Sequence, residues 1–387
     1  MIDQIIAHHD KEYGTKPVVI CSAPGKIDLL GEHGEVGGGY VVSLAIDRRF
    51  YVALSPRSDN SLRFFSGNLK ERKKTTIAGL KFKREDRWAN YSKGVIDALL
   101  HMGFSIRGAN ITLLSEVPMG IGLGASSAMT VATVCAFKEA FDLDMSDAQT
   151  IEAARFSESR FMGLHEGLRS PMVSYYAREG HLTLLDLRSL NVEHLPFPGP
   201  PLALLVTDSR VSETMSDSEK AEIDEACLDC VRVLDAPDPP HVFRDVDRDD
   251  LSSSVDGLSE RSRRISLHVI QENARILEFR KALAQDSLDT AGRILFRSHE
   301  SLRDLLEVSC PELDWLAKRA VETDGVLGSR MIGSGYGGCT VTLIDGALRA
   351  NYEDRLEEYD RIFGFKASVF AVIPGAGAGI DLSRPSR

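Results

Sequence analysis

A glycine-rich stretch at 118–129 has the residue types of an anion-binding turn. It reads Pro-Met-Gly-Ile-Gly-Leu-Gly-Ala-Ser-Ser-Ala-Met and joins a strand-like run at 111–115 to a helical run at 131–140. At such a junction, unpaired backbone N–H groups and the positive end of the helix dipole favour a phosphate. Ser126 and Ser127 add hydroxyl donors and a candidate ligand for Mg²⁺. Alternatively, the glycines only shape a tight turn and the serines cap the helix.

A second group of polar residues and glycines occupies 23–40. It lies between strand-like runs at 18–22 and 41–54 and contains Lys26, Asp28, Glu32, His33 and Glu35. Polar side chains on a glycine-rich connection between strands often contact ligands. The alternative is a solvated loop whose charges have no binding role.

A third glycine-rich segment lies near the end of the chain. Residues 330–344 read Arg-Met-Ile-Gly-Ser-Gly-Tyr-Gly-Gly-Cys-Thr-Val-Thr-Leu-Ile, which predicts a loop followed by a β-branched strand. The chain contains no internal repeat, so the three glycine-rich segments are not copies of one unit.

The rest of the pattern predicts the elements that must position these segments. Helical patterns cover 88–100, 147–162 and, in several pieces, 262–321, and strand patterns cover 181–188 and 201–208. The helical pattern is interrupted at 163–172, because Pro171 disfavours a helical residue before it. A chain of 387 residues suggests two lobes. Four prolines and a glycine at 196–201 mark their junction, and the acidic stretch 235–256 indicates a surface insertion.

Composition restricts the classes of function. Hydrophobic residues make up 43% and charged residues 27% of the chain, which is typical of a globular protein. The net charge of −11 argues against a general binder of nucleic acid or anionic membranes. No apolar run approaches the roughly 20 residues of a membrane span, and the N-terminus lacks the pattern of a signal peptide. Six dispersed cysteines suit the reduced thiols of a cytoplasmic protein, and Cys227 and Cys230 indicate helix packing rather than zinc binding.

Taken together, the glycine-rich segments at 23–40, 118–129 and 333–340 resemble the three motifs of the GHMP kinases. Further segments resemble the galactokinase family: Glu32-His33, 88–91, 185–190, 298–304 and 308–314. The resemblance covers almost the whole chain. It implies an α+β protein with the two-lobed GHMP kinase fold, in which 1–198 form a ribosomal S5 domain 2-like lobe and 199–387 a ferredoxin-like lobe.

The resemblance also implies an activity and a set of site residues. ATP would donate its γ-phosphoryl group to a sugar hydroxyl in the presence of Mg²⁺. The implied ATP-binding residues are Gly120, Gly122, Leu123, Gly124, Ala125, Ser126, Ser127, Gly335 and Gly337, and the implied metal ligands are Ser126 and Glu158. The implied substrate contacts are Glu32, His33, Glu35 and Gly167, and the catalytic positions are those of Lys26 and Ser170.

The catalytic positions depart from the galactokinase pattern. Ser170 stands where galactokinases have the aspartate thought to act as the base, and a serine hydroxyl does not accept a proton as a carboxylate does. Lys26 replaces an arginine, so it keeps the charge without the bidentate geometry. His165 or Glu166 could supply a base, or both could lie on the loop surface.

The sugar-binding positions depart as well. Glu35 stands where galactokinases have an aspartate that contacts galactose, and Lys220, Ile223 and Asp224 replace a tyrosine and paired arginines. We therefore expect an enzyme that phosphorylates a sugar or sugar-like hydroxyl other than that of galactose. Loss of the aspartate does not exclude this activity, because general acid–base catalysis typically contributes about 10²–10⁴-fold.

Two alternatives remain open. A catalytically silent regulator that binds sugar and ATP would also keep the phosphate loops, and it would act through a protein partner because no DNA-binding motif is present. A kinase for a cyclitol or modified sugar of secondary metabolism would also have an altered pocket. In each case the expected ligand is a small molecule rather than nucleic acid or membrane, and the expected assembly is a monomer or weak homodimer.

Overall fold

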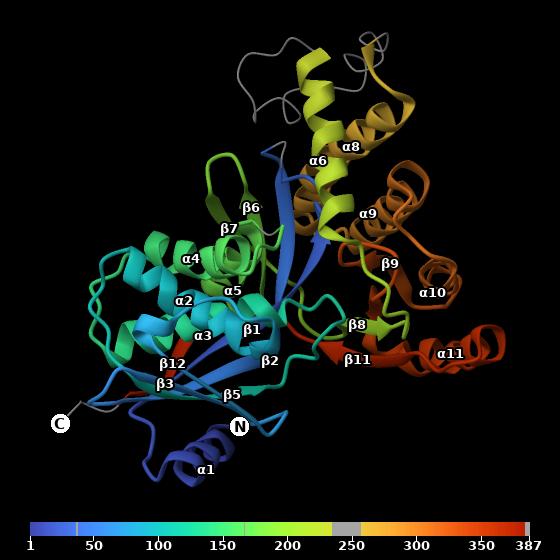
Figure 1. The fold of residues 1–387 in the computed structure, drawn as a ribbon. Helices are drawn as coiled ribbons and strands as arrows, with labels where there is room; N and C mark the ends of the chain where they lie inside the picture. The colour runs from blue at the N-terminus through green and yellow to red at the C-terminus, as the bar shows by residue number, and fades with distance from the viewer. Residues whose placement is uncertain (36–37, 166, 234–256, 384–387) are drawn as a thin grey trace.

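The computed structural model describes residues 1–35, 38–165, 167–233 and 257–383. Within these ranges the chain forms an eight-stranded sheet and a four-stranded sheet, and helices pack on both (Figure 1). This arrangement confirms the predicted α+β class.

The eight-stranded sheet holds the strands of the N-terminal half. Its order is β12-β1-β2-β5-β3-β4, and β6 pairs with β2 and β7. Only the pairing of β3 with β5 is parallel among the described strands of this sheet. The strands are β1 (Val19–Leu30), β2 (Tyr40–Pro56), β3 (Ser61–Ser66), β4 (Glu71–Thr76), β5 (Ala109–Ser115), β6 (His181–Asp186), β7 (Asn191–Pro196) and β12 (Gly379–Ser383). The division at 198/199 stays a prediction, and the last strand, β12, returns to the first sheet.

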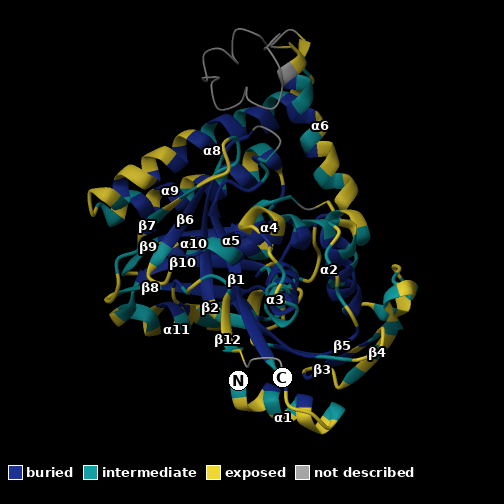
Figure 2. Cartoon of the chain, turned by 90° about the vertical axis from the view of Figure 1, so that its left-hand side faces the viewer, coloured by how far each residue is buried: buried dark blue, intermediate teal, exposed yellow. Residues whose placement is uncertain are grey.

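Helices cover both faces of the first sheet. Val19 and Cys21 belong to the apolar core shared with α2 and α3, whereas Ile20 packs with α1 on the other face, as the alternation of a strand requires. Figure 2 shows β1 and β2 buried between these layers. The helices of this half are α1 (Ile2–Tyr13), η1 (Ile77–Gly79), η2 (Arg84–Asp86), α2 (Ala89–His101), α3 (Ala125–Ala140), α4 (Asp147–Phe156), η3 (Ser157–Phe161) and α5 (Arg169–Tyr176).

The four-stranded sheet belongs to the C-terminal half. Its order is β11-β8-β10-β9, and all of its described pairs are antiparallel. The strands are β8 (Leu202–Asp208), β9 (Val326–Ile332), β10 (Cys339–Asp345) and β11 (Ser368–Val372). The helices are α6 (Asp217–Val233), α8 (Glu260–Ala284), α9 (Leu288–Ser301), η5 (Leu302–Leu306), α10 (Pro311–Val321), η6 (Gly346–Leu348) and α11 (Arg349–Phe363). None of the described helices is long and apolar enough to cross a bilayer.

One apolar cluster joins the two sheets. Ile27 and Leu29 of β1 belong to the same buried cluster as Ile332 of β9 and Val341 of β10. Because side chains alternate along a strand, the neighbouring Lys26 and Asp28 point away from this cluster. The second half of β1 therefore presents two charged side chains at the junction of the sheets.

A buried arginine links the same two strands. Arg330 of β9 is fully buried, donates from Nη1 to the Leu29 carbonyl at 2.6 Å and pairs with Glu32 just after β1. The Glu32 carboxylate also accepts the Gly333 N–H at 2.6 Å, and Glu272 of α8 lies 3.7 Å from Arg330 Nη1. These contacts connect the end of β1 to the loop that follows β9.

Most elements lie where the sequence predicts them. β5 and α3 flank the glycine-rich stretch at 118–129, and α2, β6, β8 and α8 to α10 occupy predicted ranges. The predicted helix at 147–162 is α-helical to Phe156 and continues as the π-helical η3. The insertion predicted at 235–256 lies outside the described residues.

The placement of Lys26 and Asp28 on a connection between strands was wrong. Both residues lie inside β1, which runs on to Leu30. The pairing of β1 with β2 shifts register between Pro24 and Lys26 and again between Asp28 and Leu30. These irregularities let the strand continue past its glycine and its polar residues.

Removing one partner of the Arg330–Glu32 pair leaves a buried charge without its counter-ion. We expect Arg330→Met to lower the free energy of unfolding by about 3–5 kcal/mol, measured by urea denaturation. The double variant Arg330→Met, Glu32→Gln removes both charges and should recover part of that loss. Equal losses in the two variants would contradict an unpaired buried charge as the cause.

His9 on α1 couples stability to pH. Its ring is buried against the first sheet, with Nδ1 3.0 Å from Thr112 Oγ1 and Nε2 2.9 Å from Ser55 Oγ. Burial lowers the pKa of His9 to about 4, so the unfolded chain binds this proton more readily than the folded protein does. The folded state therefore loses stability as the pH falls from about 6.5 toward 4.

From this shift we expect the free energy of unfolding to fall by about 2 kcal/mol as the pH is lowered from 7 to 5, because His9 takes up a proton in the unfolded chain only. Urea denaturation of His9→Gln at both pH values should show that this part of the pH dependence is lost. His101→Gln, a change at an exposed histidine, serves as the control and should keep it. The same pH dependence in both variants would show that His9 is not the source.

Candidate active site

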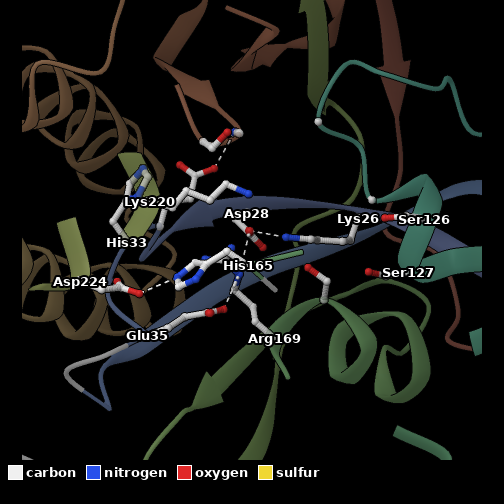
Figure 3. A pocket seen from close by; sticks show the side chains of 16 residues that line it. Lys26, Asp28, His33, Glu35, Ser126, Ser127, His165, Arg169, Lys220 and Asp224 are labelled. Atoms are coloured by element: carbon white, nitrogen blue, oxygen red, sulfur yellow. Dashed lines mark hydrogen bonds and ion pairs between the residues drawn. The ribbon is translucent and has the colours of Figure 1, made fainter. Parts of the chain in front are cut away.

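One pocket collects side chains from both halves of the chain (Figure 3). The lining comes from β1 and the turn after it, from the loop before α3 and the first turn of that helix, and from the segment before α5, α5 itself, α6 and the loop after β9. In that order the lining residues are Lys26, Asp28, Glu32, His33 and Glu35; Gly122, Gly124, Ser126 and Ser127; and His165, Arg169, Ser170, Lys220, Asp224, Gly333 and Ser334.

The first turn of α3 forms one end of the pocket, and this is the end where we expect phosphate to bind. Gly124 precedes the helix with a left-handed φ of 66° and, being glycine, has no side chain with which to cap it. A Cβ at this position would lie 2.8 Å from Lys26 Cγ, so glycine lets the lysine pack against the loop. The Lys26 N–H also donates to the Leu123 carbonyl at 2.9 Å. The unpaired backbone N–H groups in the first turn of α3 and the side chain of Lys26 thus lie at the same end of the pocket, where both can attract an anion.

A buried carboxylate stands behind this end. Glu158 lies in the π-helical turn η3 and is 1% exposed. The Ser127 hydroxyl donates to its two oxygens at 3.1 and 3.3 Å, while Ser126 lines the pocket. Among the described residues, no group of three His, Cys, Asp or Glu side chains could hold a metal ion. One carboxylate and hydroxyl oxygens nevertheless suit Mg²⁺, which takes its remaining ligands from water and substrate phosphates.

Asp28 lies at the centre of the charged wall. It pairs with Lys26, accepts the Ser43 hydroxyl at 2.6 Å and lies 3.3 Å from Arg169 Nε. Burial alone would raise the pKa of Asp28, but the charges of Lys26 and Arg169, with the Ser43 hydrogen bond, hold it well below its usual range. Asp28 is therefore a carboxylate at neutral pH.

Arg169 joins Asp28 to the turn after β1. Its Nε also lies 3.2 Å from Glu35 Oε1. Gly167 packs against the same glutamate, because a Cβ at this position would lie 2.5 Å from Glu35 Oε2. Ser170, next in the chain to Arg169, is buried in the first turn of α5. The segment that contains Ser170 thus brings a cation, rather than a second carboxylate, to the pocket.

Two histidines complete the wall. His165 Nε2 lies 2.6 Å from Asp224 Oδ2 on α6, and burial raises the pKa of Asp224 against the opposing effect of His165. His33 adopts a left-handed φ of 65°, and its Nε2 has no hydrogen-bond partner in the described part of the chain. Burial, together with His268 and Arg169, lowers the pKa of His33 to about 3. His33 therefore contributes a neutral imidazole to the pocket lining, and its Nε2 is buried.

The structure brings most of the predicted site residues together. Those that line the pocket are Lys26, Glu32, His33, Glu35, Gly122, Gly124, Ser126, Ser127 and Ser170. Glu158 and Gly167 contact this set, whereas Gly120, Leu123, Ala125, Gly335 and Gly337 lie outside the lining. Leu123 is buried in the core, and Gly335 and Gly337 pack against the backbone of Val308 and Glu213. The binding roles of all these residues stay predictions, and Glu166 lies outside the described residues.

Several pocket residues were not among the implied site residues. Arg169 had no predicted role, whereas Asp28, Lys220, Asp224, Gly333 and Ser334 were named only as parts of the motifs or of the altered sugar-binding positions. For Asp28 a signal was present, since it follows Lys26 by two residues and such residues share a strand face. The contacts of Arg169 and Asp224 join segments that are far apart in the chain, so the local sequence pattern could not predict them.

Comparisons with known proteins give consistent matches along the chain. The family models described as GHMP kinases N terminal domain and GHMP kinases C terminal match residues 90–178 and 279–361. The galactokinase galactose-binding signature matches residues 7–56. A galactokinase of Roseiflexus sp. (strain RS-1) is 33% identical over 380 residues, which cover 97% of this chain and 96% of that protein. A galactokinase of Thermotoga neapolitana is 34% identical over 343 residues, which cover 87% and 94%.

Solved structures share the fold. The crystal structure of Lactococcus lactis galactokinase complexed with galactose has a TM-score of 0.92 at 24% identity, covering 98% of this chain and 99% of that one. Methanococcus jannaschii mevalonate kinase has a TM-score of 0.66 at 16% identity, covering 94% and 99%. These likenesses confirm the predicted two-lobed GHMP kinase fold. With the sequence matches, they show that this chain belongs to the GHMP kinase superfamily and, within it, to the galactokinase family.

Proposed function

We propose that this protein uses ATP to phosphorylate a hydroxyl group of a sugar or cyclitol other than galactose. The main support is the meeting, in one pocket, of the α3 N-terminus with carboxylates and a neutral histidine. A helix N-terminus favours phosphate, and carboxylates accept hydrogen bonds from hydroxyl groups. The two ends of the pocket match the two substrates of a sugar kinase. A cytoplasmic location and a monomeric or weakly dimeric state stay predictions.

ATP fits the end of the pocket formed by α3. Its phosphates would accept hydrogen bonds from the N–H groups after Gly124, and the Lys26 ammonium would offset the charge that spreads over the transferring phosphoryl group. Bound Mg²⁺ would further neutralise the phosphate oxygens. We assign Ser126 and Glu158 as its protein ligands, and Ser127 holds the Glu158 carboxylate in place.

The acceptor fits the charged wall. His33 lines this wall as a neutral imidazole, which can exchange a hydrogen bond with an acceptor hydroxyl. Glu35, whose carboxylate lies beside Arg169, can accept a second hydroxyl. This wall differs from the galactokinase pattern at Ser170, Glu35 and Lys220, which supports an acceptor with a different arrangement of hydroxyls.

The proposal is tested by acceptor-dependent ADP release with Mg-ATP and a panel of hexoses, pentoses and cyclitols. We expect ADP and a phosphate monoester, detected by ³¹P NMR, with at least one acceptor and lower kcat/KM for galactose. Calorimetry would measure ATP binding in parallel. Measurable ATP binding without acceptor-dependent ADP for any compound would favour the silent regulator instead.

The metal assignment predicts a change in Mg²⁺ dependence. Ser126→Ala and Glu158→Gln should each raise the Mg²⁺ concentration for half-maximal ADP release about 10-fold or more, since each removes a ligand. Glu152→Gln changes a carboxylate on the same helical segment that pairs with Arg155 instead, and it should leave this concentration unchanged. Wild-type Mg²⁺ dependence in both site variants would remove them from the metal site.

A further inference from the structure

The pocket has no carboxylate at the Ser170 position, but it has carboxylates elsewhere. Among the described residues four line it: Asp28, Glu32, Glu35 and Asp224. Glu32 is occupied by Arg330 and by the Gly333 N–H. Asp224 is held by His165 on the α6 side, and Glu35 lies on the turn beyond β1 beside Gly167. Of the four, Asp28 is the one in contact with Lys26.

Contact with Lys26 places Asp28 next to the phosphate end. The backbone of Lys26 bonds to Leu123 in the glycine-rich loop, and its side chain packs against Gly124. Lys26 and Asp28 lie on the same face of β1, because they are two residues apart in a strand. A single side chain therefore separates the Asp28 carboxylate from the loop expected to bind the γ-phosphate.

The surroundings hold Asp28 in one orientation. It is 4% exposed. The Ser43 hydroxyl, from the residue paired with it on β2, donates to Oδ1 at 2.6 Å. Lys26 and Arg169 approach Oδ2. An ionised carboxylate offers about four lone-pair positions, so Oδ1 keeps capacity to accept one more hydrogen bond from a substrate hydroxyl.

We propose that Asp28 accepts the proton of the acceptor hydroxyl, in place of a carboxylate at position 170. This inference rests on the proposed kinase function. The hydroxyl oxygen forms a bond to the γ-phosphorus of ATP while the bond from that phosphorus to the β,γ-bridging oxygen breaks and ADP leaves. The hydroxyl proton passes to an Asp28 oxygen and then to water.

The basicity of Asp28 is sufficient for this role. Its neighbours make it a weak base, but in a loose phosphoryl-transfer transition state the hydroxyl keeps its proton until the new bond to phosphorus is largely formed. The proton is by then strongly acidic, so a weak carboxylate can take it. The same cations that weaken Asp28 keep it ionised and ready to accept.

The test compares Asp28→Ala with Glu35→Ala, because both carboxylates contact Arg169. For Asp28→Ala we expect kcat to fall about 10²–10⁴-fold, with small changes in acceptor KM and in the calorimetric Kd for Mg-ATP. Added formate, a carboxylate that fits the space left, should restore part of kcat. Glu35→Ala should mainly raise the acceptor KM, and formate should not affect its kcat.

The outcomes separate the inference from the function on which it rests. An active wild type with wild-type kcat in Asp28→Ala, or equal kcat losses in both variants without formate rescue, would overturn the role of Asp28 alone. A wild type inactive with every acceptor would overturn the kinase function and this inference together. Asp28→Asn, in which the Ser43 hydroxyl can turn to accept from the new amide, replaces the alanine variant if the latter fails to fold.

Discussion

The site depends on one buried interaction, the pairing of Arg330 with Glu32. Arg330 extends from the second sheet and reaches Leu29 and Glu32 at the end of β1. Through Glu32 it also fixes the backbone of Gly333, where the third glycine-rich loop begins. Two charges buried together cost desolvation free energy, and they are retained here with hydrogen bonds on several sides. The pair thus joins the turn after β1 to the loop after β9, and residues of both segments line the pocket.

Inside the pocket, charges of opposite sign are matched across segments. Lys26 and Arg169 both contact Asp28, and Arg169 also reaches Glu35. Each pairing lowers the desolvation cost of groups that would be expensive alone. An acceptor rich in hydroxyls can exchange hydrogen bonds with this wall without adding net charge. A sugar or cyclitol is therefore a better match than an anionic compound.

Much of the fold was predictable, because its signals are local. β5, the glycines at 118–129 and α3 follow from the change of apolar periodicity and from the turn residues between them. The strand β1 was predicted too short, since Gly25, Lys26 and Asp28 look like a loop until pairing with β2 is known. Backbone pairing with β2 keeps these residues in the strand, and a single sequence does not reveal which partner supplies it.

The family, the α+β class and the three glycine-rich segments were readable from the amino-acid order, because glycines at strand–helix turns and their order along the chain are local properties. The serine at position 170 was readable in the same way. Which charges meet in the pocket depends on the packing of the folded chain. Arg169, Asp28 and Glu35 come together, and Glu32 is paired with Arg330, because α5 and β9 both pack against β1. Contacts between residues so far apart are set by the packing of the two sheets, which no local pattern encodes.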